Sequence, residues 1–239
     1  RKIIGAIADQ HFAPTAVSAA ALAAEAVSPE NIFVTGNTGI DALHWVTDRI
    51  AQNPAWAANL APYEERFRGR TIIGITTHRR ENFGDGMNNI AAAIQTIAAR
   101  DDVACIFPVH MNPNVRDVMN AALGDLPNVA MIEPLDYPNF ARLLSISHIM
   151  LTDSGGLQEE TTALGIPCLT LRDNTERPVT ISDGSNRLVG TDPAAILSAA
   201  SLVLDSGERN LDSRRPQFWD GAASARILDA LQLVLIRKH

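Results

Sequence analysis

No stretch of this sequence approaches the roughly 18 consecutive apolar residues that a membrane-spanning helix needs. The first residues, Arg1 to Gly5, also lack the long apolar run and the cleavage site of a signal peptide. There is no G-x-x-x-x-G-K-[S/T] loop and no G-x-G-x-x-G turn, so neither a P-loop nucleotidase nor an ordinary dinucleotide dehydrogenase is supported. We therefore expect a cytoplasmic protein with no membrane partner.

Cysteine and positive charge are both scarce. Cys105 and Cys168 lie inside apolar runs without C-x-x-C spacing, so we expect two reduced core thiols rather than a disulfide or a zinc site. The 20 Lys and Arg residues against 27 Asp and Glu give a formal net charge of −7, which repels nucleic acid. Any phosphate ligand must then be held by local arginines, helix ends and backbone N–H groups, which favours a small nucleotide over a polymer.

The sequence does contain enough apolar material for a core, with 46% hydrophobic and 20% charged residues in 239 positions. From Thr71 onward, short apolar runs typical of strands alternate with helical patterns. These runs are residues 72–76, 103–109, 129–132, 149–152 and 168–171. Helical spacing is clearest at residues 87–97 and 157–164, the latter followed by Gly165 as a stop signal. The alternation predicts a parallel, doubly wound α/β sheet.

The opening part of the chain predicts a small β-α-β-α piece. Strands are expected at residues 3–8 and 32–34, and helices at 14–27 and 40–50. This piece is too small for a core of its own. Breakers between residues 52 and 69, such as Asn53-Pro54, predict a linker with a short helical turn. Residues 194–204 and 222–236 predict the closing helices.

Ligands of an open parallel sheet bind outside the carboxyl ends of its strands, so the loops after the strands are the candidate site. The loop at residues 77–84 contains His78 with two arginines and Glu81, which suits a pyrophosphate. An equally good interpretation is a solvated loop in which Arg79 or Arg80 pairs with Glu81. Residues 172–178 form another charged loop.

The loop at residues 153–160 offers a second kind of phosphate contact. Ser154 can cap the next helix, and Gly155 and Gly156 allow a ligand to approach bare backbone. Glu159 and Glu160 can complement the helix dipole, or a carboxylate one turn in can accept hydrogen bonds from ribose hydroxyls. Paired glycines at a helix start are a weak signal alone, but three such loops at one sheet edge strengthen it.

Histidine gives one further candidate and no metal site. His110 follows the strand pattern at residues 103–109 on the expected ligand side, although Asn112-Pro113 also suits a helix start. The remaining histidines have no metal-ligand spacing, and we expect them to be structural or solvated. They are His11, His44, His148 and His239.

Several segments together resemble the non-hydrolysing UDP-N-acetylglucosamine 2-epimerases. They are THRREN at 77–82, PVHMNP at 108–113, TDSGGLQEE at 152–160 and TERP at 175–178, with HFAPT at 11–15, GNT at 36–38, LVGTD at 188–192 and DG at 220–221. They occur in the family's order and cover essentially the whole chain. The resemblance is to the carboxy-terminal two-thirds of the family.

The resemblance implies a fold like that of type B glycosyltransferases, with two Rossmann-like domains. Residues 1–52 would be the end of the amino-terminal domain and residues 53–69 the linker. Residues 70–222 would form the UDP-binding domain, and residues 223–239 a terminal helix that returns to the first domain. The family also suggests a homodimer.

The resemblance implies a role for each candidate side chain. His78 would lie beside the diphosphate and take part in catalysis. His110, from its place after a strand, is a further candidate for binding UDP or the substrate. Ser154, Gly155 and Gly156 would hold phosphate, Glu160 the ribose hydroxyls, and Arg177 the diphosphate or the sugar, with Arg172 a less certain neighbour. Phe140 would line the uracil pocket.

In the family, UDP is eliminated across C1 and C2 to give 2-acetamidoglucal and is added back to the opposite face, without metal or redox cofactor. The acidic proton-transfer residues belong to the amino-terminal domain, whose segments are not found in this sequence. We therefore expect this chain to supply the UDP-binding, leaving-group half. The alternatives are a truncated UDP-sugar-binding module without turnover and a related glycosyltransferase.

Overall fold

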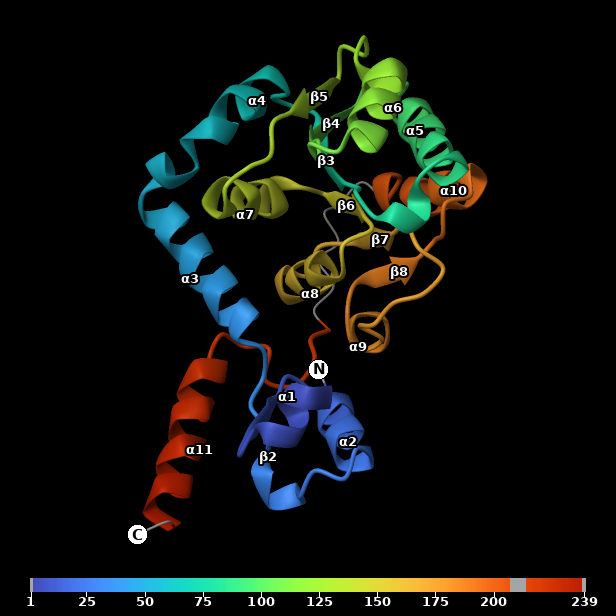
Figure 1. Ribbon diagram of the computed structural model, residues 1–239. Helices are drawn as coiled ribbons and strands as arrows, with labels where there is room; N and C mark the ends of the chain where they lie inside the picture. The colour runs from blue at the N-terminus through green and yellow to red at the C-terminus, as the bar shows by residue number, and fades with distance from the viewer. Residues whose placement is uncertain (1, 207–213, 238–239) are drawn as a thin grey trace. The chain divides into compact units, whose positions relative to one another are not determined.

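The computed structural model describes residues 2–206 and 214–237. Contacts divide the chain into two compact units, one of residues 1–45 with 215–239 and the other of residues 46–214 (Figure 1). The domain boundaries expected from the sequence stay predictions. Within the described ranges, no helix is both long and apolar enough to cross a membrane.

The first unit is built on two short parallel strands. β1 (His11–Ala13) pairs with β2 (Ile32–Val34) in the register that sets Phe12 beside Phe33. The helical elements of this unit are α1 (Lys2–Ile7), α2 (Ala16–Ala24), η1 (Pro29–Asn31) and α11 (Ala223–Arg237). Helix α3 (Thr38–Gln52) begins in the first unit and ends in the second.

The predicted strand at residues 3–8 is wrong, because this segment forms helix α1. A short apolar run does not by itself distinguish a strand from a helix. Ile3, Ile4 and Ile7 have the three- and four-residue spacing of one helix face, and all three are largely exposed. The β-α-β-α order survives because β1, at His11–Ala13, takes the place of the predicted strand.

The second unit contains a sheet of six parallel strands in the order β5-β4-β3-β6-β7-β8. Their bounds are β3 (Thr71–Thr76), β4 (Val103–Pro108), β5 (Val129–Ile132), β6 (Ile149–Thr152), β7 (Cys168–Thr170) and β8 (Asn186–Leu188). The parallel, doubly wound prediction is confirmed. The edge strand β8 was not predicted. Its buried residue Asn186 and exposed residue Arg187 are both polar, so the segment has no apolar run.

Helices cover both faces of this sheet, as Figure 1 shows. On one face α5 (Asp85–Ile97), α6 (Pro113–Leu123) and α10 (Pro193–Leu204) pack on strand residues such as Cys105 and Phe107. On the other face α7 (Tyr137–Ile146) and residues from 60 to 67 pack on Ala104 and Ile106. Strands buried on both faces carry continuous apolar runs, which is why the sequence reveals them.

The remaining helical elements of this unit are η2 (Pro54–Leu60), α4 (Ala61–Arg66), η3 (Arg80–Asn82), α8 (Gly155–Leu164) and α9 (Val179–Ser182). The segment predicted as a linker with a short turn is therefore mostly helical. Asn53 caps η2 by accepting the Ala55 N–H, while Leu60 and Phe67 are buried in the core. Gly165 ends α8 in the left-handed conformation, as predicted.

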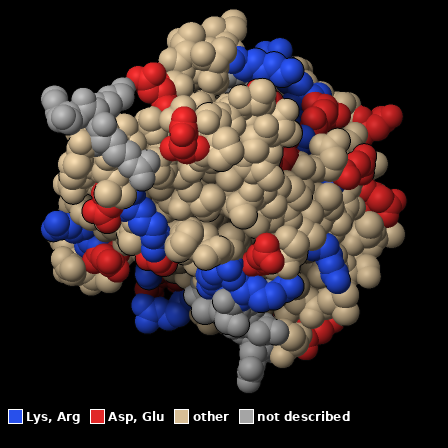
Figure 2. Space-filling view, turned by 90° about the horizontal axis from the view of Figure 1, so that it is seen from below, with Lys and Arg blue, Asp and Glu red and all other residues tan. Residues whose placement is uncertain are grey.

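Acidic and basic side chains lie next to one another on the face seen in Figure 2. They form small groups with uncharged surface between them.

Gly74 allows β3 to lie close to its neighbours, and the chain should tolerate no side chain there. An added Cβ would meet Sδ of Met150 and lie 2.7 Å from Oγ of Ser147, and both side chains are fully buried. We predict that Gly74→Ala lowers the free energy of unfolding by about 1–3 kcal/mol through overpacking. Gly86→Ala, in helix α5 of the same unit, meets only ordinary contacts and should stabilise by up to about 1 kcal/mol.

Urea unfolding of both variants measures these changes from the transition midpoints. Equal stability of the Gly74→Ala and Gly86→Ala chains would contradict the packing described around β3.

Candidate nucleotide site

The candidate site lies where the strand order of the six-stranded sheet reverses direction. The chain runs from β3 outward to β4 and β5, and then returns to start β6, β7 and β8 on the other side. β3 and β6 are therefore neighbours whose loops diverge, and a crevice opens at their carboxyl ends. Thr77 and His78 follow β3, while Asp153 and Ser154 follow β6.

A pocket of about 410 Å³ occupies this edge, which is within the usual range for a small-molecule site. Most of the residues singled out from the sequence line it. They are His78, His110, Phe140, Ser154, Gly156 and Glu160. Four loops that are far apart in the sequence thus contribute to one cavity.

Several of the side chains that line this pocket are apolar. They are Pro108, Pro134, Leu135, Phe140 of α7 and Leu157 of α8. Flat, apolar walls with an aromatic ring suit a nucleobase.

Glu160 also lines the pocket and is paired with a tyrosine. The phenol of Tyr137 donates a hydrogen bond of 3.0 Å to Oε1 of Glu160. Burial raises the pKa of Glu160 above its ordinary value, while the hydrogen bond from Tyr137 opposes the rise. A carboxylate in this position can accept hydrogen bonds from hydroxyl groups of a ligand.

His78 is fixed at the polar end of the pocket by Asp153. The carboxylate of Asp153 is fully buried, and its Oδ1 lies 3.3 Å from Nδ1 of the half-exposed His78 ring. The backbone N–H groups of His78 and Arg79 also donate to this carboxylate. The histidine is therefore anchored through both its main chain and its ring.

His110 stacks on His78. The two imidazole rings have centroids 5.5 Å apart and an interplanar angle of 16°. Nδ1 of His110 accepts the backbone N–H of Asn112, and Asn112 caps α6 by accepting the Asn114 N–H. Asn112 thus starts a helix, as one interpretation of the sequence held, and His110 also lines the pocket.

The start of α8 presents bare backbone to the pocket. Ser154 occupies the N-cap position, but its side chain makes no capping hydrogen bond, so the predicted capping role is wrong. Its backbone N–H instead donates to Oγ1 of Thr152. Backbone N–H groups in the first turn of a helix have no intrahelical acceptor and favour an anion.

Two arginines lie near this helix start. An added Cβ on Gly155 would lie 3.6 Å from Nη2 of Arg79, which places a guanidinium beside the glycine backbone. Arg172 is buried and donates to both carboxylate oxygens of Glu176, at 2.9 and 3.0 Å. These hydrogen bonds lower the pKa of Glu176 to about 2. Glu81 pairs with Arg172 across the loops, and not with Arg79 or Arg80 as the alternative interpretation of this loop held.

Gly155 and Arg177 are not among the residues that line the pocket. Gly155 is buried directly behind its rim, between Ser154 and Gly156. Nε of Arg177 lies 2.7 Å from Oε1 of Glu159, one residue round α8 from Glu160. The role of Arg177 toward a ligand stays a prediction, because in this arrangement its charge is directed to Glu159.

Sequence reasoning missed Tyr137 and Asp153. Asp153 directly follows β6, and a carboxylate at that position is the signal that could have identified it. Tyr137 begins α7 after the cap residue Asp136, so its position looks like an ordinary helix start. Only the structure shows that its phenol reaches Glu160 of α8.

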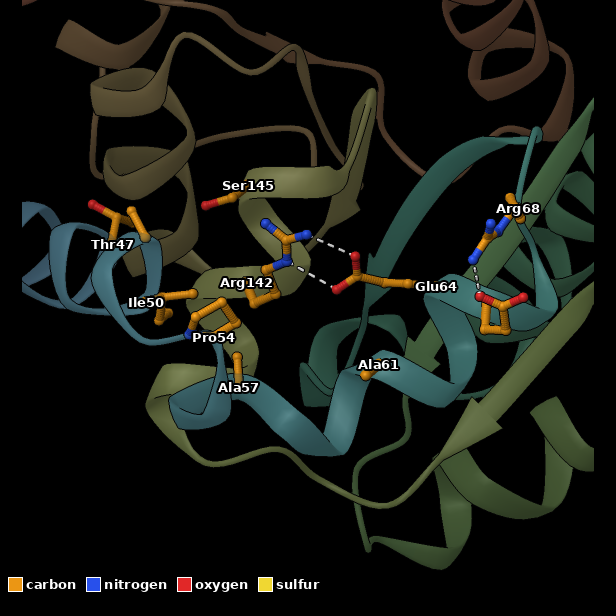
Figure 3. A pocket seen from close by; sticks show the side chains of 11 residues that line it. Thr47, Ile50, Pro54, Ala57, Ala61, Glu64, Arg68, Arg142 and Ser145 are labelled. Carbon is orange, nitrogen blue, oxygen red and sulfur yellow. Dashed lines mark hydrogen bonds and ion pairs between the residues drawn. The ribbon is translucent and has the colours of Figure 1, made fainter.

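A second cavity in the same unit, of about 710 Å³, has a different character (Figure 3). Arg142 points to Glu64 and makes two hydrogen bonds to it, at 2.8 and 2.7 Å. Arg68 forms an ion pair with Glu65 through one contact. The charged side chains of this second cavity are thus already paired with one another. None of the predicted site residues lines the cavity.

The predictions about thiols and metals concern residues outside the pocket. Cys105 and Cys168 are free and buried, as predicted, and burial raises the pKa of Cys105 to about 12. In the described part of the chain, no group of three or more His, Cys, Asp or Glu side chains could hold a metal ion. His239 lies outside the described residues.

The fold and the pocket together define a Rossmann-like α/β protein with a candidate nucleotide site at the switch point of its sheet. The model of the family "UDP-N-acetylglucosamine 2-epimerase" matches residues 1–232. The chain belongs to the UDP-N-acetylglucosamine 2-epimerase family.

Individual relatives agree with this membership. The UDP-N-acetylglucosamine 2-epimerase of Salmonella typhimurium is 44% identical over 236 residues, which are 97% of this chain and 63% of the relative. The UDP-GlcNAc 2-epimerase of Neisseria meningitidis, in a crystal structure bound to UDP-GlcNAc, matches with a TM-score of 0.88 and 35% identity over 97% of this chain and 63% of that one. S. aureus MnaA, in a co-structure with UDP, has a TM-score of 0.88 and 34% identity over 98% and 63%. The chain thus spans less than two thirds of the length of these relatives.

We predict that Tyr137→Phe raises the pKa of Glu160 further, because it removes the hydrogen bond that favours the carboxylate. Carboxyl-selective NMR across a pH titration measures this change. Tyr63→Phe replaces the other tyrosine of the chain and should leave Glu160 unaltered. A pKa that is unchanged or lower in the Tyr137→Phe chain would contradict the pairing.

The raised pKa also has a consequence for stability. Glu160 binds its proton more tightly in the folded chain than in the unfolded chain. Its contribution to stability is therefore present below its unfolded pKa and is lost as the pH rises through its folded pKa.

Proposed function

We propose that this chain binds the UDP moiety of UDP-N-acetylglucosamine and supplies the leaving-group half of a UDP-N-acetylglucosamine 2-epimerase. The observation that carries the proposal is the single pocket at the switch point that unites His78, Ser154, Gly156, Phe140 and Glu160. Its apolar and polar ends match the uracil and diphosphate ends of UDP. The relatives crystallised with UDP-GlcNAc or UDP support this choice of ligand.

We assign the parts of UDP along the pocket from one end to the other. Phe140 and the apolar walls receive uracil, and Glu160 accepts hydrogen bonds from the ribose hydroxyls. Bound hydroxyls would replace the Tyr137 phenol at this carboxylate. Ser154 and the backbone of Gly155 and Gly156 hold the diphosphate, with Arg79 beside them.

The proposed reaction eliminates UDP across C1 and C2 of the sugar and adds it back to the opposite face. The departing diphosphate needs hydrogen-bond donors and positive charge, because negative charge develops on it as the bond to C1 breaks. His78 and the start of α8 are placed to provide these. Removal of the C2 proton needs a positioned base, which is a separate task.

We propose that this base lies outside the pocket described here. The pocket-lining residues include one carboxylate, Glu160, which the proposal assigns to ribose. The acid and base would come from the amino-terminal part found in the longer relatives. The homodimer and the cytoplasmic location also remain proposals that follow from the family resemblance and the sequence.

Calorimetric titration with UDP tests the binding site. We expect His78→Ala and Arg177→Ala each to weaken binding by roughly tenfold to a hundredfold, or about 1.4–2.8 kcal/mol. Arg142→Lys, in the second cavity, is the matched control and should bind UDP as tightly as the unchanged chain. Unaltered affinity in both of the first two variants would reject the assignment.

Isotope exchange at C2 separates binding from turnover. We expect the 239-residue chain to bind UDP-N-acetylglucosamine in deuterium oxide without introducing deuterium at C2, because the proposed base is not in its pocket. Mass spectrometry of the recovered sugar nucleotide measures the exchange. Rapid exchange would show that this chain contains its own base. It would contradict the proposal that the base lies in the amino-terminal part.

The same experiment addresses the second candidate function, a UDP-sugar-binding module without turnover. The observation that favours this candidate is that the pocket-lining residues include one carboxylate, Glu160, which the proposal assigns to ribose. A chain extended by the amino-terminal part of a relative distinguishes the two. Exchange gained by the extended chain supports the epimerase half, and its absence supports the module.

A further inference from the structure

Asp153 is the most completely satisfied buried charge at the site. Its carboxylate is fully buried in the gap between the ends of β3 and β6. Oδ2 accepts hydrogen bonds from the Thr77 hydroxyl at 2.8 Å, the backbone N–H groups of His78 and Arg79 at 2.9 and 2.8 Å, and the Asn82 amide at 3.1 Å. A buried carboxylate is costly unless it is matched in this way, so the loop from 77 to 82 is built around it.

The other oxygen of this carboxylate has a different role. Oδ1 lies 3.3 Å from Nδ1 of His78 and 3.2 Å from the His78 backbone N–H. A carboxylate oxygen can only accept a hydrogen bond, so this close approach favours a proton on Nδ1. In a neutral imidazole the other nitrogen, Nε2, is then left without a proton and remains available to the pocket.

His110 completes the arrangement from the open side. It stacks on the His78 ring, and its own Nδ1 accepts the Asn112 N–H, so its proton is on Nε2 when the ring is neutral. The two stacked rings therefore have opposite tautomers. His78 is held between a fixed carboxylate and a fixed ring, which restricts its rotation.

We propose that Asp153 is a positioning residue that keeps a proton of His78 on Nδ1 and directs Nε2 toward the diphosphate of the leaving group, to which the imidazolium form donates from Nε2. Asp153 directly precedes Ser154. Its hydrogen bonds to the loop after β3 therefore also fix that loop relative to the start of α8. The functional part of this inference rests on the proposed function. The contact between Asp153 and His78 does not.

The isosteric variant Asp153→Asn makes a specific prediction about the tautomer. Its single amide oxygen should stay at the Oδ2 position, where it keeps four donors. Its NH₂ group then replaces Oδ1 and faces Nδ1 of His78. A donor at that place requires Nδ1 to become an acceptor, so the proton should move to Nε2.

Long-range ¹H–¹⁵N correlation spectra of the unliganded 239-residue chain, at a pH where the imidazoles are neutral, report the tautomer. The His78 signals are identified by their loss in His78→Gln. We expect an Nδ1–H tautomer for His78 in the unchanged chain and an Nε2–H tautomer in Asp153→Asn. Thr77→Val removes a different hydrogen bond from the same carboxylate, and it should leave the Nδ1–H tautomer in place.

Either of two results overturns the proposal. One is an Nε2–H tautomer of His78 in the unchanged chain, which needs no variant to fold. The other is a folded Asp153→Asn chain whose His78 keeps its proton on Nδ1.

Two substitutions of His78 then test which nitrogen faces the ligand. His78→Asn retains an amide near the Nδ1 position, whereas His78→Gln carries one near the Nε2 position. We expect His78→Gln to bind UDP about tenfold more tightly than His78→Asn, which retains only the contact with Asp153. Equal affinity, or tighter binding by His78→Asn, would contradict the proposed orientation.

The proposed function and the proposed role of Asp153 can be contradicted separately. If the unchanged chain binds no UDP, the proposed function fails while the NMR result still decides the role of Asp153. If UDP binds and the tautomer of His78 is Nε2–H, only the inference about Asp153 fails.

Discussion

The buried carboxylate of Asp153 sets the geometry on which the candidate site depends. It stands at the one place in the six-stranded sheet where neighbouring strands, β3 and β6, lead their chains in opposite directions. A charge buried there must be matched by donors, and the loop after β3 supplies them from Thr77, His78, Arg79 and Asn82. The hydrogen bonds that match the charge of Asp153 thus fix the position of His78, and the His78 ring lines the pocket.

The pocket combines apolar and polar contacts because several strands contribute to it. The ends of β4 and β5 and helix α7 bring apolar side chains such as Leu135 and Phe140, while the loops after β3 and β4 bring His78 and His110. The start of α8 adds backbone N–H groups. A ligand with a flat base and a negatively charged group fits this combination. The second cavity differs, since Arg142 and Glu64 already neutralise each other.

The sequence was informative wherever burial imposed a period. The central strands are buried on both faces and were predicted to within one or two residues, and Met87, Ile90, Ile94 and Ile97 marked the buried face of α5. Loops at the ends of parallel strands converge by topology, so His78 and Ser154 could be placed together before the structure was known. The family resemblance supplied the individual roles, which the residues alone left open.

Other features depend on contacts that no local pattern encodes. The exposed isoleucines of α1 and the helical segment from 54 to 66 were misread because short apolar runs and proline breakers fit several structures. The side chain of Ser154 does not cap α8, although its backbone has the cap conformation. Arg177 turns to Glu159, and Tyr137 donates a hydrogen bond to Glu160 of another helix. These two contacts were decided by partners distant in the sequence.

The central claim is that UDP lies across the ends of β3 and β6, and a crystal structure of this chain with UDP tests it most directly. The account predicts uracil against Phe140, ribose hydroxyls on Glu160, and the diphosphate between His78 and the backbone of Ser154 to Gly156. UDP bound instead in the cavity beside Arg142 and Glu64, or in the reverse orientation with its diphosphate against Phe140, would contradict it.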